Sequence, residues 1–368
     1  MKMALSAETN SQLMKVAQLY EYNKPYRTAY GPIPEIKDNE LLVRVHAAGY
    51  CHSDLQVMQG QFPSKLPMIP SHEPAGVIVR VGSKCPGSWR QGDRVGVLNF
   101  KHTCGQCTGC GLSRRRNNKL DPRFCERRET AGFRHDGAFA EFIVADPQTT
   151  VLLPNSISFQ QAAPLMCAGA TVWGALEKAT AGLEAGDTVA IVGIGGLGHL
   201  GVQFAKAMGY RVVAIDNRPA GRQLAREMEN SELLPDLVVD STASDNATAG
   251  IYDFTNGEGL AAVVVCTDSL AANAWALTLL RIQGVMVALG LPPDKWQFDS
   301  GIMVFKELVI RGSYVADTES TERMMELVDK HNVRSQLTVV PFDKIPEIVD
   351  LYKEASFKGR LIVQISEE

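Results

Sequence analysis

Short apolar runs separated by glycine and proline dominate the first half of the chain. Each run has the length of one β-strand, and the clearest ones span residues 41–45, 76–81, 94–98 and 139–144. Closely spaced strands with turn signals between them are typical of an all-β or β-rich domain. We therefore expect the N-terminal part of the chain to form such a domain.

From about Cys167 onward, apolar runs alternate with segments of helical periodicity, such as residues 270–280. The expected strands span residues 189–192, 212–215, 237–239, 262–266 and 285–289. Strands that alternate with helices predict a parallel, doubly wound sheet. A short apolar run at 308–310 and a final strand at 360–365 follow. The pattern as a whole predicts an α/β protein of two domains.

One segment, residues 188–216, combines a strand, a glycine-rich turn, a helix, a second strand and a terminal acid. This order is the fingerprint of dinucleotide-binding domains. Glycines let the backbone turn tightly near a pyrophosphate, and the following helix offers free N–H groups to it. We expect the turn to bind the cofactor through Gly193, Gly195, Gly196, Leu197 and Gly198. The alternative is a turn whose glycines serve only packing.

Asp216, at the end of the second strand, bears on the choice of cofactor. A carboxylate at this position accepts hydrogen bonds from the adenosine ribose and repels a 2′-phosphate, which favours NAD over NADP. Arg218 and Arg222 follow closely and could hold a phosphate. NADP is therefore kept as the minority alternative.

Composition limits the function only broadly. The 368 residues suit two domains, and the net charge of −4 gives no general attraction to nucleic acid or anionic membranes. No apolar run reaches the roughly 18 residues of a membrane span, and the N-terminus lacks the apolar core of a signal peptide. We expect a cytoplasmic protein that binds neither nucleic acid nor membrane. The basic segment 112–121 and the polar segment 240–250 are expected to be exposed loops.

Four of the eight cysteines lie close together in the sequence: Cys104, Cys107, Cys110 and, after fourteen further residues, Cys125. In a cytosolic enzyme such spacing indicates metal binding before disulfides. Four thiolates fit a closed tetrahedral zinc site, which stabilises a loop and performs no chemistry. The alternative is a set of reduced thiols without a metal.

A second set of metal ligands is dispersed along the chain. Cys51, His72 and Cys167 together supply two thiolates and one imidazole. Such a set leaves one zinc position open, which is the composition of a catalytic zinc site. Sequence spacing alone does not bring the three together, and each residue taken singly could equally be an ordinary core or surface residue.

Several motifs recur in order along nearly the whole chain. They are GYCHSD, PSHEPAG, the cysteine triplet, TAGFRHDGAFAEF, QAAPLMCAGATVWGAL and GIGGLGHLGVQFAKAMG. Together they resemble the zinc-dependent medium-chain alcohol dehydrogenases, in particular the microbial, yeast-type branch. The resemblance implies a GroES-like β-rich catalytic domain over residues 1–166, completed by 306–368, and a Rossmann NAD-binding domain over 167–305. It also implies a catalytic and a structural zinc in each subunit, and a homotetramer rather than a dimer.

The resemblance also assigns roles around the catalytic zinc. Cys51, His72 and Cys167 would bind the ion, and Glu73 would lie close to it. Asp54 would orient a zinc ligand, as carboxylates beside metal sites do. The hydroxyl of Ser53 would accept the substrate proton.

Cofactor contacts follow from the same resemblance. His52 would contact a cofactor phosphate, Thr171 would lie beside the nicotinamide, and Arg360 would lie near the pyrophosphate. The second cluster, Cys104, Cys107, Cys110 and Cys125, would bind the structural zinc, with an insertion before its last member.

Two departures from the family pattern concern the substrate. Gln56 stands where relatives often place a histidine as the last base of a proton relay, and glutamine does not accept a proton near neutral pH. Met58, Phe62 and Asn99 stand where ethanol-preferring relatives tend to carry tryptophans. We therefore expect a roomier pocket that accepts alcohols bulkier than ethanol.

The resulting hypothesis is a zinc-dependent oxidoreductase that interconverts a small-molecule alcohol and its aldehyde or ketone by hydride transfer to NAD. Two alternatives stay open at this point. One is an NADP-linked aldehyde reductase of a biosynthetic pathway. The other is a non-catalytic protein that binds zinc and a dinucleotide, which the intact ligand set disfavours.

Overall fold

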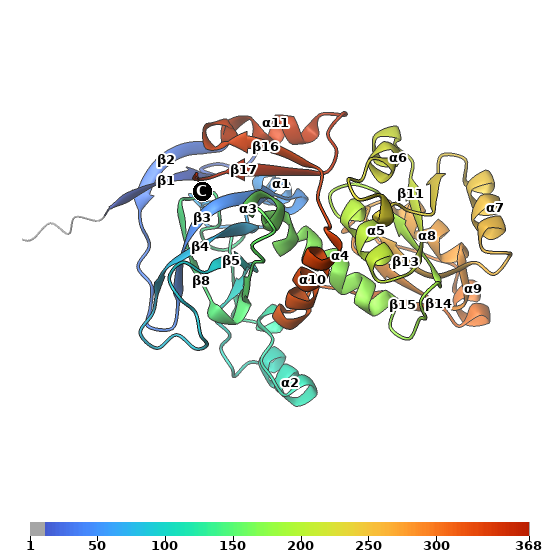
Figure 1. The fold of residues 1–368 in the computed structure, drawn as a ribbon, viewed down its shortest axis with the longest axis horizontal. Coiled ribbons are helices and arrows are strands. Elements are labelled where there is room, and N and C mark those ends of the chain that lie inside the picture. Colours follow the sequence, from blue (N-terminus) through green and yellow to red (C-terminus); the bar gives the residue numbers. More distant parts are fainter. Residues whose placement is uncertain (1–11, 368) are drawn as a thin grey trace, which may run out of the picture.

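The computed structural model describes residues 12–367. Figure 1 shows a strand-rich part, built from the N-terminal half and the C-terminal segment, beside a part in which helices cover a parallel sheet. Residues 1–11, part of the segment for which we expected no signal peptide, lie outside the described residues. Within residues 12–367, no helix has both the length and the apolar character to cross a bilayer.

A seven-stranded sheet forms the strand-rich part and joins segments from both halves of the chain. Its order is β16-β17-β3-β4-β5-β9, and β8 also pairs with β3. β17 runs antiparallel to β3 and places Leu361 opposite Tyr50, so the final segment returns to the N-terminal sheet. The strands are β3 (Leu41–Tyr50), β4 (Pro74–Val81), β5 (Arg94–Val97), β8 (Phe142–Ala145), β9 (Thr150–Leu152), β16 (Leu337–Pro341) and β17 (Arg360–Gln364).

Smaller elements surround this sheet. Two separate antiparallel pairs are β1 (Leu13–Gln18) with β2 (Arg27–Pro32), and β6 (Phe100–Lys101) with β7 (Glu129–Thr130). The helices of this part are α1 (His52–Met58), α2 (Thr108–Asn117), α3 (Phe159–Ala162), α10 (Thr318–His331) and α11 (Ile348–Lys353). Short 3-10 segments cover Pro122–Phe124, Pro147–Thr149, Ala163–Met166 and Phe342–Glu347.

The second part is a six-stranded parallel sheet in the order β12-β11-β10-β13-β14-β15. The strand order reverses between β10 and β13, and ligands of such sheets bind in the crevice at that reversal. The strands are β10 (Thr188–Val192), β11 (Arg211–Asp216), β12 (Leu237–Asp240), β13 (Leu260–Val265), β14 (Leu280–Ala288) and β15 (Val309–Gly312). The helices are α4 (Ala168–Ala179), α5 (Gly198–Ala207), α6 (Pro219–Arg226), α7 (Ser244–Phe254), α8 (Leu270–Thr278) and α9 (Ser300–Lys306), with a 3-10 turn at Ser231–Leu233. This is the predicted doubly wound fold.

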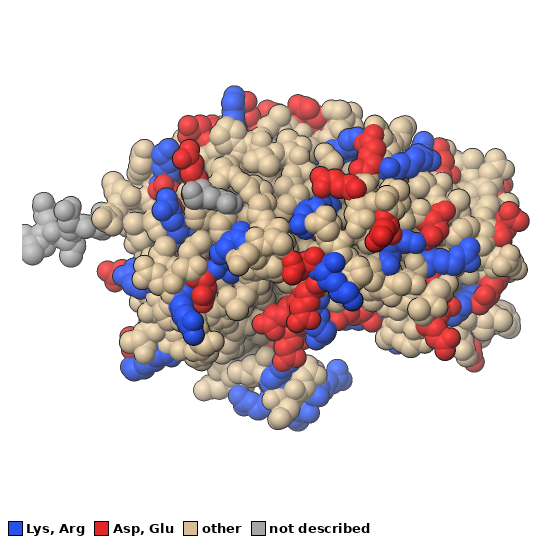
Figure 2. All heavy atoms as spheres, viewed as in Figure 1, with Lys and Arg blue, Asp and Glu red and all other residues tan. Residues whose placement is uncertain are grey.

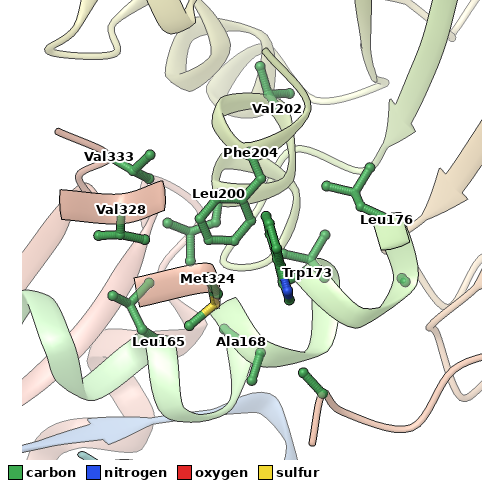
Figure 3. Packing of buried hydrophobic residues seen from close by; sticks show 14 of the residues in the cluster. Leu165, Ala168, Trp173, Leu176, Leu200, Val202, Phe204, Met324, Val328 and Val333 are labelled. Atoms are coloured by element: carbon green, nitrogen blue, oxygen red, sulfur yellow. The ribbon is translucent and has the colours of Figure 1, made fainter. Parts of the chain in front are cut away.

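The two parts share one apolar core, centred on α4. Figure 3 shows Trp173 of α4 packed against Phe204 of α5, with Met324 of α10 beside them. The rings of Trp173 and Phe204 meet edge to face at a centroid distance of 5.6 Å. The indole N–H of Trp173 donates to the Ser320 hydroxyl at 3.0 Å, so its buried polar group is satisfied. Because this core is continuous, it fixes the position of one sheet relative to the other.

Two predicted loops are helices. Residues 112–121 fall largely in α2, where the Cys107 sulfur accepts the Cys110 N–H at the start and Asn118 ends the helix with a φ of 54°. Three arginines near its C-terminus interact favourably with the helix dipole. Residues 240–250 overlap α7, whose buried Ala247 and Ile251 are one helical turn apart. Both segments lack a wide apolar stripe, so periodicity did not reveal them.

β15 differs from the expected domain division. We expected the Rossmann domain to end at residue 305, but β15 pairs in parallel with β14 and forms the last strand of the six-stranded sheet. The short apolar run at 308–310 that we noted in the sequence is part of this edge strand. The chain crosses back to the strand-rich part only after it.

Candidate active site and metal centres

A cleft of about 1860 Å³ lies between the two sheets and takes its walls from both. Its lining includes dispersed metal ligands from one side and the glycine turn after β10 from the other. Of the predicted site residues, the cleft wall contains Cys51, His52, Ser53, His72, Cys167, Thr171, Gly193, Gly195, Gly196, Leu197, Asp216, Arg360, Phe62 and Asn99. Residues from distant parts of the sequence therefore meet at one cavity.

The dispersed ligands form a compact cluster. One donor atom from each of Cys51, His72, Glu73 and Cys167 lies within 4.8 Å of the others. Cys51 immediately precedes α1, His72 and Glu73 precede β4, and Cys167 precedes α4. The His72 Nε2 atom lies 3.2 Å from the Cys167 sulfur. Two sulfurs and an imidazole nitrogen that converge in this way fit a zinc ion.

Asp54 holds this cluster in place. Its Oδ2 accepts the Cys51 backbone N–H at 2.8 Å, and its Oδ1 lies 3.1 Å from His72 Nδ1. Since a carboxylate only accepts, His72 Nδ1 carries the proton and Nε2 is free to bind a metal. Burial opposes the charged form of His72, but the charge and hydrogen bond of Asp54 raise its pKa well above the ordinary value. Asp54 is itself fully buried.

Glu73 and Arg360 form a buried ion pair behind the ligands. Arg360 Nη2 donates to Glu73 Oε1 at 2.6 Å. Burial raises the pKa of Glu73 to about 7, although the charge of Arg360 acts in the opposite direction. A Cβ added to Gly196 would lie 3.0 Å from Arg360 Nη1, so the guanidinium lies against the glycine turn as well. Arg360 thus connects the metal cluster with the predicted pyrophosphate site.

Three further residues face the cleft near the ligands. Ser53 Oγ lies 4.0 Å from the Cys51 sulfur. Gln56 is 8% exposed and lines the cleft. His52 Nε2 lies 3.7 Å from Asp268 Oδ2, which follows β13 in the other part. His52 and Asp268 therefore face each other across the cleft.

The glycine turn has the geometry that its sequence predicts. Gly193 has a φ of +89°, which favours glycine strongly. A Cβ on Gly198 would lie 2.0 Å from the Gly193 carbonyl oxygen, so Gly198 allows α5 to begin directly against the strand end. Gly198 does not line the cleft and acts through this packing.

The Asp216 carboxylate lies beside the turn at the end of β11. It accepts the Ile194 N–H at 2.7 Å and the Arg218 N–H at 2.7 Å. Arg218 also lines the cleft, and its side chain pairs with Asp216 at 3.1 Å. Arg222, in contrast, is directed to Asp240, which it pairs with at 2.8 Å, and it does not line the cleft. Arg218 is therefore better placed than Arg222 to meet a cofactor phosphate.

The four neighbouring cysteines form a second cluster that shares no residue with the first. Donor atoms of Cys104, Cys107, Cys110 and Cys125 lie within 4.8 Å of one another, at the base of α2. Hydrogen bonds from the Cys110 and Glu126 N–H groups lower the pKa of Cys107 to about 6, which favours its thiolate at neutral pH. Four sulfurs in a closed group fit a structural zinc ion.

At the substrate end of the cleft, one of the predicted lining residues is absent and several other residues are present. Phe62 and Asn99 line it, whereas Met58 is 5% exposed, packs in the core and does not line the cleft. The Phe133 ring lies 4.9 Å from the His72 ring and 5.7 Å from Phe62. Sequence reasoning missed several lining residues, namely Phe133, Arg128, Arg134, Tyr314 and Tyr352. Phe133 and Arg134 belong to the quoted motif TAGFRHDGAFAEF, which is the one signal that pointed to them.

Comparison with known proteins finds similar sequences and structures. Residues 37–155 match the family described as Alcohol dehydrogenase GroES-like domain, and residues 196–330 match Zinc-binding dehydrogenase. An alcohol dehydrogenase of Geobacillus stearothermophilus is 35% identical over 356 residues, which cover 96% of this chain and 100% of that protein. A similar structure is the alcohol dehydrogenase of Aeropyrum pernix, with a TM-score of 0.81, 30% identity and coverage of 95% and 99%. Acetophenone reductase from Geotrichum candidum, solved in complex with NAD, has a TM-score of 0.78, 25% identity and coverage of 96% and 97%.

Proposed function

Because the chain belongs to the zinc-dependent medium-chain alcohol dehydrogenase family, we propose that it interconverts a primary or secondary alcohol and its aldehyde or ketone with NAD as hydride carrier. Its similarity to alcohol dehydrogenases identifies it as a zinc-dependent alcohol oxidoreductase. The observation that carries the proposal is the convergence of Cys51, His72 and Cys167 at the cleft that also holds the glycine turn.

The two bound groups supply the chemistry, and the chain positions them. When bound, zinc supplies a Lewis acid that lowers the pKa of an alcohol, and NAD supplies the hydride acceptor. Asp54 keeps His72 in the tautomer that presents Nε2 to the ligand cluster. Ser53, at the cleft wall, takes the substrate proton and releases its own outward. Thr171, His52 and Arg360 line the part of the cleft where the cofactor is proposed to bind.

Removal of ligands tests the metal assignment directly. Cys51→Ala and His72→Ala should each lose zinc from the dispersed cluster and nearly all turnover. Cys85→Ala is the matched control, because Cys85 lies outside both clusters. Turnover at the wild-type rate in either ligand variant would contradict the proposed site.

NAD is proposed over NADP because of Asp216, whose carboxylate would repel a 2′-phosphate. Arg218 keeps the NADP alternative testable, since its half-exposed side chain lies beside Asp216 at the cleft wall. Initial rates with both cofactors should favour NAD, and Arg218→Ala should reduce any activity with NADP. Higher efficiency with NADP in the wild type would reverse the assignment.

A preference for alcohols bulkier than ethanol is the proposed specificity. Phe62 and Asn99 support it, since both line the cleft at positions where tryptophan would leave less room. A panel that includes ethanol, 1-hexanol and benzyl alcohol tests the idea through kcat/KM. If ethanol is the most efficient substrate, the pocket assignment is wrong.

Gln56 is proposed to slow proton release, because its amide lines the cleft but has no basic atom. Gln56→His should therefore shift the pH dependence of alcohol oxidation. The measurement is the pH profile of kcat in both proteins, and identical profiles would remove Gln56 from the proton route.

Assembly as a cytoplasmic homotetramer of the yeast-type branch is a further proposal. Exposed apolar side chains on β14, α9 and β15 support self-association, with Ile282 at 70%, Val304 at 68% and Phe305 at 88% exposure. Static light scattering on the purified protein gives the oligomeric mass. A monomer at micromolar concentration would contradict it.

A further inference from the structure

The cleft wall contains two arginines that the proposed reaction does not use. Arg128 and Arg134 flank one turn, in which the Phe133 and Arg134 N–H groups donate to the Thr130 carbonyl at 3.2 and 3.0 Å. Phe133 of the same turn packs on the metal ligand His72. Both arginines line the cleft, and the turn that they flank contacts the metal ligand His72 through Phe133.

Neither arginine is neutralised by the protein. Within residues 12–367, neither Arg128 nor Arg134 makes an ion pair. Arg128 donates from Nη1 to the Cys125 carbonyl at 2.8 Å, while its buried Nε has no hydrogen-bond partner among the described residues. The carboxylates of the cleft wall are Asp216, Asp268 and Glu354, all from segments outside 99–134. Guanidinium N–H groups of these two arginines are thus available to donate hydrogen bonds to an anion at this end of the cleft.

Aromatic contacts hold the Arg128 guanidinium in place. Its Cζ lies 5.8 Å from the centre of the Tyr314 ring, and that ring lies 5.5 Å from Phe100. Both rings line the cleft. A guanidinium fixed beside aromatic faces is suited to bind a planar carboxylate through two parallel hydrogen bonds. The rings of Phe133 and Phe62, which contact each other and of which Phe133 contacts His72, suit a hydrocarbon or aromatic body of the substrate.

The surrounding segment strengthens the local field. Residues 108–134 contain eight Lys and Arg and three Asp and Glu, a net charge of +5 in a chain of −4, and Asp317 and Glu319 at the start of α10 offset part of it by pairing with Lys119 and Arg123. Figure 2 shows Lys and Arg side chains gathered on α2, which projects from the molecule. A positive surface beside a cleft raises the encounter rate with anionic ligands, and salt weakens that effect.

We propose that the substrate is an alcohol, or the corresponding aldehyde, that carries a carboxylate at its far end, and that Arg128 and Arg134 bind this carboxylate. The inference rests on the proposed function, because the hydroxyl end is taken to bind at the Cys51, His72 and Cys167 cluster. Arg128 and Arg134 act as specificity residues and take no part in the bond changes.

The test compares 4-(hydroxymethyl)benzoate with its methyl ester, two alcohols that differ in the charge of one end. The carboxylate should have a kcat/KM at least about tenfold higher, mainly through KM. Its advantage should shrink as NaCl is raised, while the ester should respond little. Equal efficiencies, or a preference for the ester, would overturn the inference. Turnover of both compounds would still leave the proposed alcohol oxidation intact, so the two failures are distinguishable.

Substitutions of the two arginines test whether they bind the substrate carboxylate or only support the fold. Arg128→Met and Arg134→Met should raise KM for the carboxylate about tenfold each and leave KM for the ester unchanged. Arg127→Met is the control, because it removes the same charge from an exposed neighbour outside the cleft wall. If Arg128 only supports the Cys125 carbonyl, Arg128→Met will lose zinc and impair both substrates equally. That outcome, or an Arg127 effect of the same size, would also overturn the inference.

Discussion

Arg360 and Glu73, 287 residues apart in sequence, form an ion pair inside the protein, with Arg360 Nη2 2.6 Å from Glu73 Oε1. Both side chains are buried, at 3% and 0% exposure. Removing one partner of such a pair leaves an uncompensated charge out of water, which costs far more than the pair itself contributes. Single and double substitutions at this pair can therefore separate the contribution of charge to stability from the contribution of packing.

Arg360→Met should destabilise the protein by up to about 3–5 kcal/mol, because Glu73 loses the charge that lowers its pKa and must either stay unpaired in the interior or take up a proton. Glu73→Gln combined with Arg360→Met should recover part of this loss, since no buried charge is left. Chemical denaturation of the wild type, the single variant and the double variant provides the comparison. Equal destabilisation of the single and double variants would show that packing, rather than charge, dominates.

Asp54→Asn should weaken zinc binding at the dispersed cluster by about 10- to 100-fold, the usual effect of losing a carboxylate that orients a metal-bound histidine. The amide lacks the charge that holds the His72 ring and can present N–H groups to it. Competition with a chromophoric chelator measures the affinity. Asp38→Asn is the control, since Asp38 is exposed, pairs with Lys84 and belongs to neither cluster. An unchanged affinity in Asp54→Asn would mean that the ring is held by other contacts.

Cys107→Ser should remove the metal of the second cluster and leave the first cluster loaded, because the two groups share no residue. Elemental analysis should show a loss of half the zinc. Limited proteolysis should then cut the segment around α2, which the remaining contacts, such as the ion pairs of Lys119 with Asp317 and Glu319, hold less firmly. Loss of all zinc in this variant would indicate that the two sites depend on each other.

His199 predicts a loss of stability in mild acid. Burial lowers its pKa to about 4 from the ordinary 6.5. At a pH between these two pKa values, His199 is therefore neutral in the folded protein and protonated in the unfolded chain. Stability is therefore present above the higher pKa and is lost as pH falls toward the lower one, by up to about 3 kcal/mol. Nδ1 donates to the Gly195 carbonyl, which leaves Nε2 to accept from the Ser335 hydroxyl in the neutral ring.

Denaturation midpoints at pH 7 and pH 4.5 test this linkage in the wild type and in His199→Asn, whose amide can replace the donor to Gly195. The variant should lose less stability on acidification. His135 shifts in the same direction, because burial lowers its pKa to about 4, so the dependence should shrink without vanishing. An equal drop in both proteins would exclude His199 as a contributor.

The sequence predicted best where local rules and tertiary structure agree. The β10–α5–β11 unit has a buried strand, obligatory glycines and an acid in one continuous segment, and all of these lie where expected. The seven-stranded sheet was expected only in outline, because the pairing of β17 with β3 joins residues from opposite ends of the chain. The resemblance to a family, rather than periodicity, indicated this return.

The metal clusters were predictable because cysteine and histidine are chemically distinctive. For the dispersed cluster, only the resemblance to the family indicated that its residues lie together. The arginines of the cleft were not, since Arg128 and Arg134 look like ordinary surface cations in sequence. α2 and α7 were missed for a different reason. Their stability depends on caps, helix-dipole contacts and a few buried residues, which leave no apolar period to detect.

The strand order also has a consequence for synthesis of the chain. All six strands of the parallel sheet lie between residues 188 and 312, so their residues are all synthesised before those of β16. The edge of β3 that receives β17 must wait for the last residues of the polypeptide. The strand-rich part, whose first strands are synthesised first, is therefore completed last. Arg360, at the start of β17, reaches Glu73 only in that final step.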